Sequence, residues 1–345
     1  MSGIQIVGMG HAIPSVCVTN TDLQKVTDTS DEWIRTRTGI RERHFCGEGE
    51  TLTTLAVRAA AEAIASSGIR KEQIQLVITA TVTPDFQVPS TSCLVQESLQ
   101  LPAGIPAFDI NAACSGFVYG LQLVQALLPE GEYALLIGAE QLSRMLDFEE
   151  RSTSVLFGDG AAAAVLCKDP GARFYAHLAA DGRRSALWAP VPSQNPLPAW
   201  NNFCRTRVLG GEQTKGQSRE NHKEKNRERT EPYLHMDGRA VFRFAVRALE
   251  EEIQTLENLS DVSAEEVDQI VCHQANQRII DYVRKARHLP EEKFYQNLDR
   301  YGNTSGASVP LALYDLWNMG KLKPGTRIFC IGFGAGLTWA GAALL

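Results

Sequence analysis

The 345-residue chain contains no apolar run long enough to cross a membrane. Its longest apolar stretches, at 133–139 and 161–167, are far shorter than the roughly 20 residues that a membrane helix requires. The N-terminal segment lacks the basic start of a secretory signal and leads directly into a strand-like pattern. We therefore expect a globular protein of the cytoplasm.

Metal-ligand spacing and basic stripes are also missing. The eight cysteines form no Cys-x-x-Cys pair and no cluster with histidine, which predicts reduced thiols and no metal site. The chain has 34 Lys and Arg and 40 Asp and Glu, which gives a formal net charge of −6. No stripe of basic residues alternates with aromatic residues. Nucleic acid is not an expected partner, whereas a small molecule or an acidic protein remains open.

The chain repeats one plan. A helical pattern at 52–64 precedes a buried strand at 75–80, and a helical pattern at 242–256 precedes a strand at 269–272. Because the strands are continuously apolar, we expect helices on both faces of each sheet. The repeat predicts a layered α/β fold of two halves, 1–170 and 171–345.

Two further features bear on this plan. The repeat aligns Cys114-Ser115-Gly116 with Thr304-Ser305-Gly306. A segment at about 194–230 does not fit it, because basic and acidic residues alternate there without apolar periodicity. We interpret that segment as a solvated surface insertion, with a substrate lid as the alternative.

Cys114 is a candidate nucleophile. It stands where a strand-like run at 105–111 meets a helical pattern at 117–128. At a helix N-terminus, unpaired backbone N–H groups and the positive dipole end stabilise a thiolate, so the pKa of the thiol is expected to be lowered. The alternative is a small buried core residue, which is the commoner role of a lone cysteine.

His273 and Asn303 are candidate partners for Cys114. His273 directly follows the strand at 269–272, at the carboxyl end where α/β folds place ligands. Asn303 lies in a loop before a helix at 309–317, and alone it is typical of a turn residue. The repeat places the Cys114 and Asn303 loops opposite each other, so we expect all three residues in one cleft.

Five motifs in register resemble a known family. These motifs are the segments 29–43, 109–117, 157–161, 273–276 and 301–305. In sequence and order they are similar to β-ketoacyl-acyl carrier protein synthase III, the initiating condensing enzyme of type II fatty-acid synthesis in the thiolase superfamily. The resemblance implies a thiolase-like fold layered α-β-α-β-α and a homodimer.

The resemblance also implies the chemistry. Cys114 would accept an acyl group from a coenzyme A thioester, and malonyl-acyl carrier protein would then lose CO₂ and attack that group. His273 and Asn303 would hydrogen-bond the malonyl thioester carbonyl, as suits two N–H donors. The backbone N–H groups of Cys114 and Ala335 would form the oxyanion hole, provided that Ala335 has a negative φ. No cofactor is implied, because coenzyme A is part of a substrate.

Binding residues follow from the same resemblance. Trp33 would stack on the adenine of coenzyme A with Arg151 on its other side, while Arg37 and Arg278 would bind phosphates. The pantetheine tunnel would be lined by Leu156, Met236, Gly238, Phe242 and Asn276. The cations expected to dock the acidic carrier protein are Arg243, Arg278, Arg284 and Lys285.

Val88 stands where relatives often carry an aromatic residue, at a wall of the acyl pocket that the partner subunit contributes. Valine leaves more room, so we expect acyl donors longer or more branched than acetyl to be accepted.

Three other functions remain open from sequence. A condensing or acyltransfer enzyme of specialised metabolism would share the three polar residues and use another acceptor. A papain-like hydrolase uses Cys, His and Asn in the same chain order. A non-catalytic acyl-binding or scaffold protein would not load an acyl group.

Overall fold

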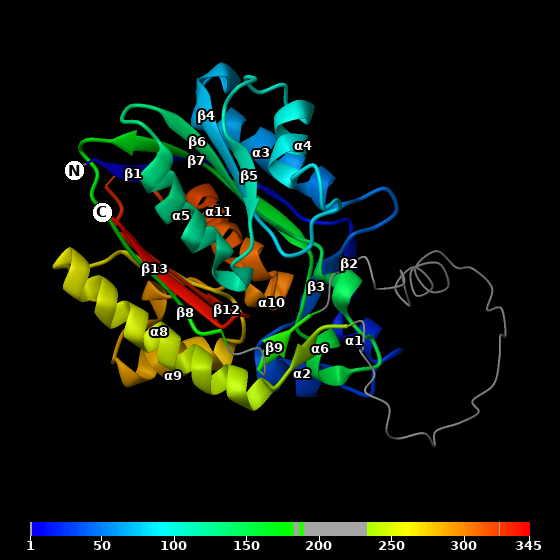
Figure 1. The fold of residues 1–345 in the computed structure, drawn as a ribbon. Helices are drawn as coiled ribbons and strands as arrows, with labels where there is room; N and C mark the ends of the chain where they lie inside the picture. Colours follow the sequence, from blue (N-terminus) through cyan, green and yellow to red (C-terminus); the bar gives the residue numbers. More distant parts are fainter. Residues whose placement is uncertain (1, 183–185, 190–232, 324) are drawn as a thin grey trace.

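The computed structural model describes residues 2–182, 186–189, 233–323 and 325–345 (Figure 1). The predicted insertion at about 194–230 lies outside the described residues. Within the described parts of the chain, no helix is long and apolar enough to cross a membrane.

The first half forms a five-stranded sheet in the order β1-β7-β6-β4-β5. Strand β4 runs parallel to β5 and β6, whereas β7 runs antiparallel to β6 and to β1. The strands are β1 (Gly3–Ala12), β4 (Ile74–Ala80), β5 (Ala107–Ile110), β6 (Tyr133–Glu140) and β7 (Gly160–Asp169).

The second half forms a four-stranded sheet in the order β11-β12-β13-β8. Strand β11 is parallel to β12, and β13 is antiparallel to both of its neighbours. The strands are β8 (Phe174–Ala180), β11 (Gln269–Cys272), β12 (Ile328–Gly334) and β13 (Thr338–Leu344). Read as β8-β13-β12-β11, this order and these directions match β1-β7-β6-β4, so the two halves repeat one topology.

Helices make three layers around the two sheets (Figure 1). In the centre, α5 (Gly116–Leu127) and α11 (Ser308–Asn318) pack between the sheets. On the outer face of the first sheet lie α3 (Leu52–Ser67) and α4 (Thr91–Ser98); on that of the second lie α8 (Gly238–Ser260) and α9 (Gln277–Ala286). The layered α-β-α-β-α fold is therefore confirmed.

Local sequence explains the outer helix α3. Thr51 caps its N-terminus by accepting a hydrogen bond from the Thr54 N–H, and Gly68 ends it in a left-handed conformation, φ 71°. The predicted apolar stripe is buried against β1 and β7, including Leu55 and Ala59, and only Ile64 at its end is partly exposed. Burial of this stripe fixes the helix on the sheet.

Smaller elements pack beside the sheets around a separate core that contains Ile34, Phe45 and Phe148. Strands β2 (Val16–Thr19) and β3 (Glu42–Phe45) form an antiparallel ladder, and β9 (Leu187–Trp188) pairs with β10 (His235–Met236). The short helices are α1 (Asn20–Leu23), α2 (Asp31–Thr38), α6 (Arg151–Ser154) and α10 (Leu298–Tyr301).

The structure corrects one detail of the predicted repeat. Helices α5 and α11 each follow a 3₁₀ turn, Ala113–Ser115 and Ser305–Ala307. These turns open at Ala113 with φ 47° and at Ser305 with φ 48°, so Cys114 corresponds to Gly306 rather than to Thr304. The matching Ser-Gly letters of the two segments misled the alignment.

Candidate active site

Cys114, His273 and Asn303 line one cavity of about 120 Å³. Cys114 follows β5 and lies in the turn that leads into α5, His273 directly follows β11, and Asn303 follows α10. All three side chains are largely buried, at 7%, 2% and 6% exposure. The two halves of the fold thus bring residues that are far apart in sequence to one place.

Glycine lets β12 approach the thiol. A Cβ added to Gly334 would lie 2.8 Å from the Cys114 backbone nitrogen and 3.2 Å from its Sγ. Only a residue without a side chain fits at that distance. The next residue, Ala335, is therefore held beside Cys114, and it has no positive φ, which is the condition that an alanine needs here.

The hydrogen bonds of His273 determine which ring nitrogen carries the proton. Nδ1 lies 2.6 Å from the Ser308 Oγ, and that oxygen accepts from the Gln274 backbone N–H at 3.3 Å. A Ser308 hydroxyl that donates to Nδ1 leaves the proton of the neutral ring on Nε2, and this is the tautomer that we assign. Burial lowers the pKa of His273 to about 3, which keeps the ring neutral at physiological pH.

Asn303 is oriented in a similar way. Its Oδ1 accepts from the Ser305 backbone N–H at 2.9 Å. Because a backbone N–H can only donate, the amide oxygen faces Ser305, and the NH₂ group is left for a ligand. Both His273 and Asn303 can thus donate hydrogen bonds, and both acceptor atoms are already engaged.

The prediction of a lowered pKa for Cys114 is wrong. Burial raises the pKa of this thiol to about 12, and the negative charge of Glu140 adds to the effect. A hydrogen bond from Ser305 and the backbone N–H of Cys114 act in the opposite direction without reversing it. The resting side chain is therefore a neutral thiol, because loss of water costs more than these two hydrogen bonds return.

Glu140 and Ser305 are functional candidates that sequence reasoning missed. Ser305 hydrogen-bonds Cys114, and its Oγ lies 3.1 Å from Oε1 of Glu140. Glu140 ends β6, is fully buried, and accepts further bonds from Thr83 Oγ1 at 2.7 Å and the Val82 N–H at 3.1 Å. Burial raises the pKa of Glu140 to about 7 despite these donors. A lone acid at the end of an apolar strand was the available signal.

The residues expected at coenzyme A lie together at the surface. The Trp33 ring has the Arg37 guanidinium 5.0 Å from its centroid and that of Arg151 4.6 Å from it. Asn276 Nδ2 donates to the Arg37 carbonyl at 3.1 Å, and the Arg278 guanidinium lies 6.0 Å from the Phe242 ring. Two cations and an indole are thus available for a base and phosphates.

The expected tunnel residues line the same cavity as the three polar residues: Leu156, Met236, Gly238, Phe242 and Asn276. The sequence did not identify the apolar walls, which include Phe157, Val241, Phe244, Ile279, Phe333 and Leu337. Phe333 lies edge-on to the His273 ring, with centroids 5.2 Å apart. A narrow apolar passage ending at polar donors suits an acyl chain.

Two further sets of predicted residues lie away from this cavity. Val88 is 83% exposed and does not line it. Of the expected docking cations, Arg243, Arg278 and Lys285 are exposed. Arg284 is half-buried, lies within 4.0 Å of acidic oxygens of Asp281 and Glu291, and is the least free to meet a partner.

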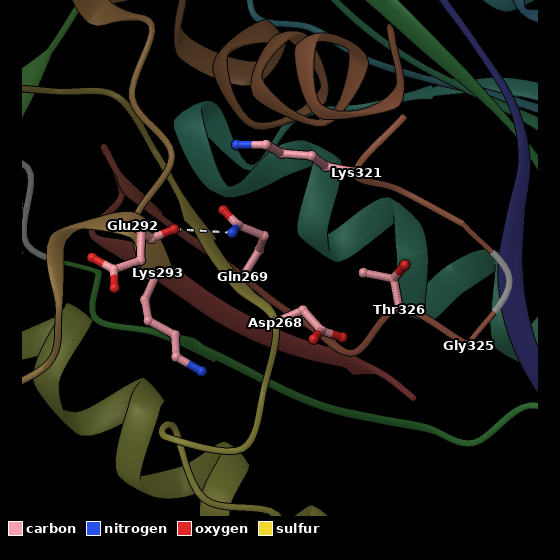
Figure 2. Close-up of a pocket in the computed structure, with 7 residues that line it drawn as sticks. All are labelled: Asp268, Gln269, Glu292, Lys293, Lys321, Gly325 and Thr326. Atoms are coloured by element: carbon pink, nitrogen blue, oxygen red, sulfur yellow. Dashed lines mark hydrogen bonds between the residues drawn. The ribbon is translucent and has the colours of Figure 1, made fainter. Parts of the chain in front are cut away.

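A second hollow, more open and about 500 Å³ in volume, lies at the opposite, amino-terminal end of β11 (Figure 2). Two of its polar side chains are engaged with the main chain: Gln269 Nε2 donates to the Glu292 carbonyl at 2.9 Å, and Asp268 accepts from the Arg327 N–H at 2.8 Å. The described residues that line it include no thiol or imidazole, so we place the chemistry in the cavity of Cys114.

Comparisons with known proteins agree with this geometry. Two family models match: 3-oxoacyl-[acyl-carrier-protein (ACP)] synthase III over residues 108–182, and its C-terminal model over 258–345. A beta-ketoacyl-[acyl-carrier-protein] synthase III of Clostridium perfringens is 43% identical over 352 aligned positions, covering 100% of this chain and 99% of the relative.

Solved structures are similar over the same length. The 3-oxoacyl-[acyl-carrier-protein] synthase III from Aquifex aeolicus VF5 has a TM-score of 0.84 at 38% identity, covering 99% of each chain. The priming beta-ketosynthase from the R1128 polyketide biosynthetic pathway has a TM-score of 0.82 at 31% identity, covering 99% of this chain and 96% of the other.

Proposed function

The chain belongs to the 3-oxoacyl-[acyl-carrier-protein] synthase III family, and on that premise we propose that it condenses an acyl-CoA primer with malonyl-acyl carrier protein through an acyl-Cys114 intermediate. It is an acyl-transferring condensing enzyme of fatty-acid synthesis. A papain-like hydrolase is excluded by the layered fold, and a non-catalytic scaffold by the family.

One observation carries the assignment of roles. Ser308 lies against Nδ1 of His273, and the Ser305 N–H donates to Oδ1 of Asn303. With the Ser308 hydroxyl as the donor, both side chains present N–H donors to the cavity of Cys114. Two fixed donors in a site without bulk water stabilise the negative oxygen of an enolate. Neither residue is set up to take the proton of the thiol.

Ser305 and Glu140 supply that proton acceptor. The thiol S–H transfers its proton to the Ser305 Oγ as the Ser305 hydroxyl proton passes to Oε1 of Glu140, 3.1 Å away. A carboxyl group with a pKa raised to about 7 can take up and return a proton near neutral pH. The raised pKa of Cys114 then means only that the resting side chain is a thiol. The thiolate forms as the sulfur attacks the thioester, when its proton passes to Glu140.

The two half-reactions balance in protons. In the first, the Cys114 sulfur attacks the thioester carbon, and coenzyme A leaves and takes a proton from solvent. In the second, malonyl thioester loses CO₂, its enolate oxygen is held by the Nε2–H of His273 and the NH₂ of Asn303, and the carbanion attacks acyl-Cys114. The departing Cys114 thiolate regains its proton from Glu140 through Ser305. The reaction uses only groups of this chain and its substrates, without a cofactor.

The surface residues bind the rest of the substrates. Trp33, with Arg37 and Arg151, holds the adenine and phosphates of coenzyme A, and Arg278 assists them. The pantetheine arm enters along Leu156, Met236, Gly238, Phe242 and Asn276, which line the cavity together with Cys114. The acidic carrier protein docks on the exposed cations Arg243, Arg278 and Lys285, and Arg284 contributes least.

The chain acts as a homodimer in this proposal. Phe86 and Val88 are large apolar residues that are 57% and 83% exposed, and a second copy that covers them would place Val88 at its partner's acyl pocket. Equilibrium sedimentation tests the dimer, and a monomer at micromolar concentration would contradict it.

Mass spectrometry after incubation with a panel of acyl-CoAs tests the whole proposal. We expect a mass increase of one acyl group on the wild type and none on Cys114→Ser, with branched and longer donors loading at least as well as acetyl. Loading of the Cys114→Ser variant would refute the nucleophile. A strict preference for acetyl would refute the role of Val88.

The similarity to a polyketide priming ketosynthase supports one alternative, a condensing enzyme of specialised metabolism that uses another acceptor. Product analysis with malonyl-acyl carrier proteins of both pathway types separates the two. Turnover on the fatty-acid carrier alone supports the first proposal.

A further inference from the structure

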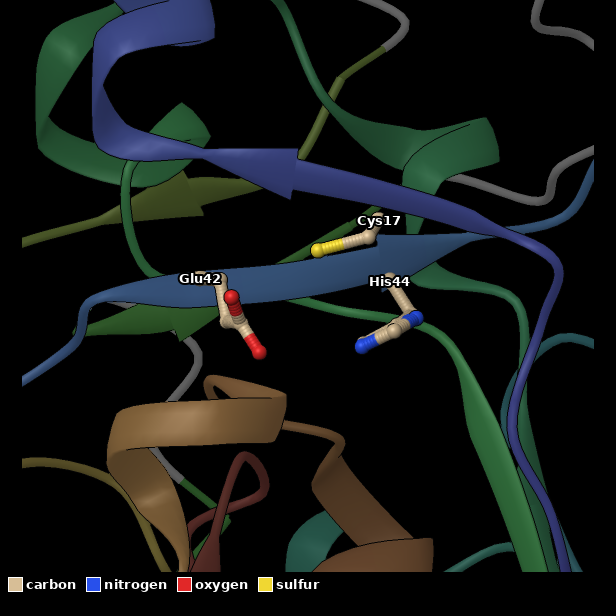
Figure 3. A group of neighbouring side chains, drawn as sticks. All are labelled: Cys17, Glu42 and His44. Carbon is tan, nitrogen blue, oxygen red and sulfur yellow. The ribbon is translucent and has the colours of Figure 1, made fainter.

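Three potential metal ligands meet on the ladder of β2 and β3. Cys17 is directly opposite His44, and Glu42 lies two residues before His44, so all three side chains point to the same face. One ligand atom from each lies within 4.8 Å of the other two. Figure 3 shows the three side chains side by side on this face.

His44 is already oriented as a ligand. Its Nδ1 lies 3.1 Å from the carbonyl oxygen of Pro14. Because a carbonyl only accepts, Nδ1 carries the ring proton and Nε2 keeps its lone pair. Metal-bound histidines commonly have this second hydrogen bond, which fixes the tautomer and the direction of the ring.

The charges favour a divalent cation. The Cys17 thiol hydrogen-bonds Glu42. A thiolate and a carboxylate this close repel each other, and a cation of charge +2 would neutralise both. Arg43, the cation between Glu42 and His44 in the sequence, points to the opposite face of the ladder, where it donates to the Val18 and Val155 carbonyls.

We propose that Cys17, Glu42 and His44 bind one zinc-type divalent cation, with water as the fourth ligand. Sulfur and imidazole select zinc over magnesium or calcium. Tetrahedral zinc with ligand distances of about 2.0–2.3 Å needs ligand atoms about 3.5 Å apart. Closing from at most 4.8 Å requires side-chain adjustment of about 1 Å, which the exposed Cys17 can make.

The cation would join β2 to β3 next to the active-site loop. The His44 carbonyl accepts from the Asp159 N–H at 2.8 Å, and the neighbouring Gly158 N–H donates to the Asn303 carbonyl at 3.0 Å. We therefore expect bound zinc to stabilise this region against thermal unfolding. The sequence predicted no metal site, because ligands brought together across a ladder leave no local spacing motif.

Metal titration of the untagged full-length protein, first stripped with a chelator, tests the proposal. We expect wild type to bind one equivalent of Co²⁺ with a thiolate charge-transfer absorption band, and to release it to Zn²⁺. Cys17→Ser and His44→Gln should each weaken binding at least 10-fold. Cys93→Ser is the matched control, because the Cys93 thiol faces the Ala107 carbonyl, and it should bind like wild type.

Peptide mass spectrometry gives a second readout that does not depend on the variants. Zinc should protect Cys17 from alkylation in the wild-type protein. Circular dichroism and acyl loading verify that each variant is folded. Wild type that binds neither metal at micromolar concentration, or variants that both bind as tightly as wild type, would overturn the proposal.

Discussion

Replacing Glu140 with glutamine tests the buried acid beside Cys114. The amide oxygen takes the place of Oε1, where it accepts from the Ser305 hydroxyl and, at 3.3 Å, from the Val82 N–H. The NH₂ takes the place of Oε2 and faces the hydroxyls of Thr81 and Thr83, which can rotate to accept. The change therefore removes the titration of this site and leaves its shape.

The expected effect on stability follows from the pKa. Burial raises the pKa of Glu140 from 4.5 to about 7. Between these values the unfolded chain releases the proton and the folded chain keeps it, so the free energy of unfolding falls as pH rises. At about 1.4 kcal/mol per pH unit, the free energy of unfolding of wild type should fall by about 3 kcal/mol over this range. That of Glu140→Gln should not show this fall.

Urea unfolding of both proteins from pH 4.5 to 7.5 measures this difference. Asp159, also buried and with a pKa raised to about 6, titrates in both proteins and cancels when they are compared. If the difference in the free energy of unfolding between wild type and variant stays constant with pH, the raised pKa of Glu140 is refuted.

Acyl loading gives the functional counterpart. A protonated Glu140 cannot accept the thiol proton, so wild-type loading should rise through pH 7, whereas Glu140→Gln should load slowly and without that inflection. Ser305→Ala, which breaks the same route and keeps Glu140, should behave alike; Ala113 already adopts the φ of 47° that the new alanine needs. An unchanged pH profile in both variants would rule out the route.

Three further predictions concern the cavity and its entrance. Ser308→Ala removes the donor to His273 Nδ1, a buried hydrogen bond worth about 1–3 kcal/mol. Condensation should slow about 10- to 100-fold, whereas single-turnover acyl loading should be unchanged. Equal slowing of both steps would contradict the role of Ser308. Gly334→Ala would put a Cβ 2.9 Å from the Cys114 Cβ. We therefore expect the free energy of unfolding in urea to fall by about 1–3 kcal/mol and acyl loading to be impaired. A fully active variant of normal stability would disprove the close approach. Trp33→Ala should raise KM for acyl-CoA about 5- to 30-fold, as expected for about 1–2 kcal/mol of stacking. The kinetics on acyl-pantetheine, which lacks the adenine, should not change. Equal effects on both acyl donors would argue against stacking.

Periodicity and repetition were enough to predict a layered α/β fold of two halves, and the resemblance to a known family supplied the α-β-α-β-α arrangement. The strand at 269–272 and the helices at 52–64 and 309–317 correspond to β11, α3 and α11. Apolar patterns report burial directly, and a duplicated pattern constrains the topology of both halves. Letter identity was less reliable in the turns, where the φ values of Ala113 and Ser305 define the true correspondence.

Features that arise from tertiary contacts were not accessible from sequence. A helix N-terminus predicted a lowered pKa for Cys114, but the closed cavity raises it, and burial of that kind has no local signature. The hydrogen bonds of Ser308 and Glu140 depend on rotamers set by packing. Cys17 and His44 meet only because β2 and β3 pair in one register.

The division of labour in the cavity is the central claim, and separating the two half-reactions of His273→Ala tests it most directly. With acyl-CoA alone, mass spectrometry should find this variant acylated on Cys114 at the wild-type rate. When malonyl-acyl carrier protein is added, CO₂ release and product formation should fall by at least 100-fold, about 3 kcal/mol of enolate stabilisation. Equal loss of acylation and condensation would contradict the account.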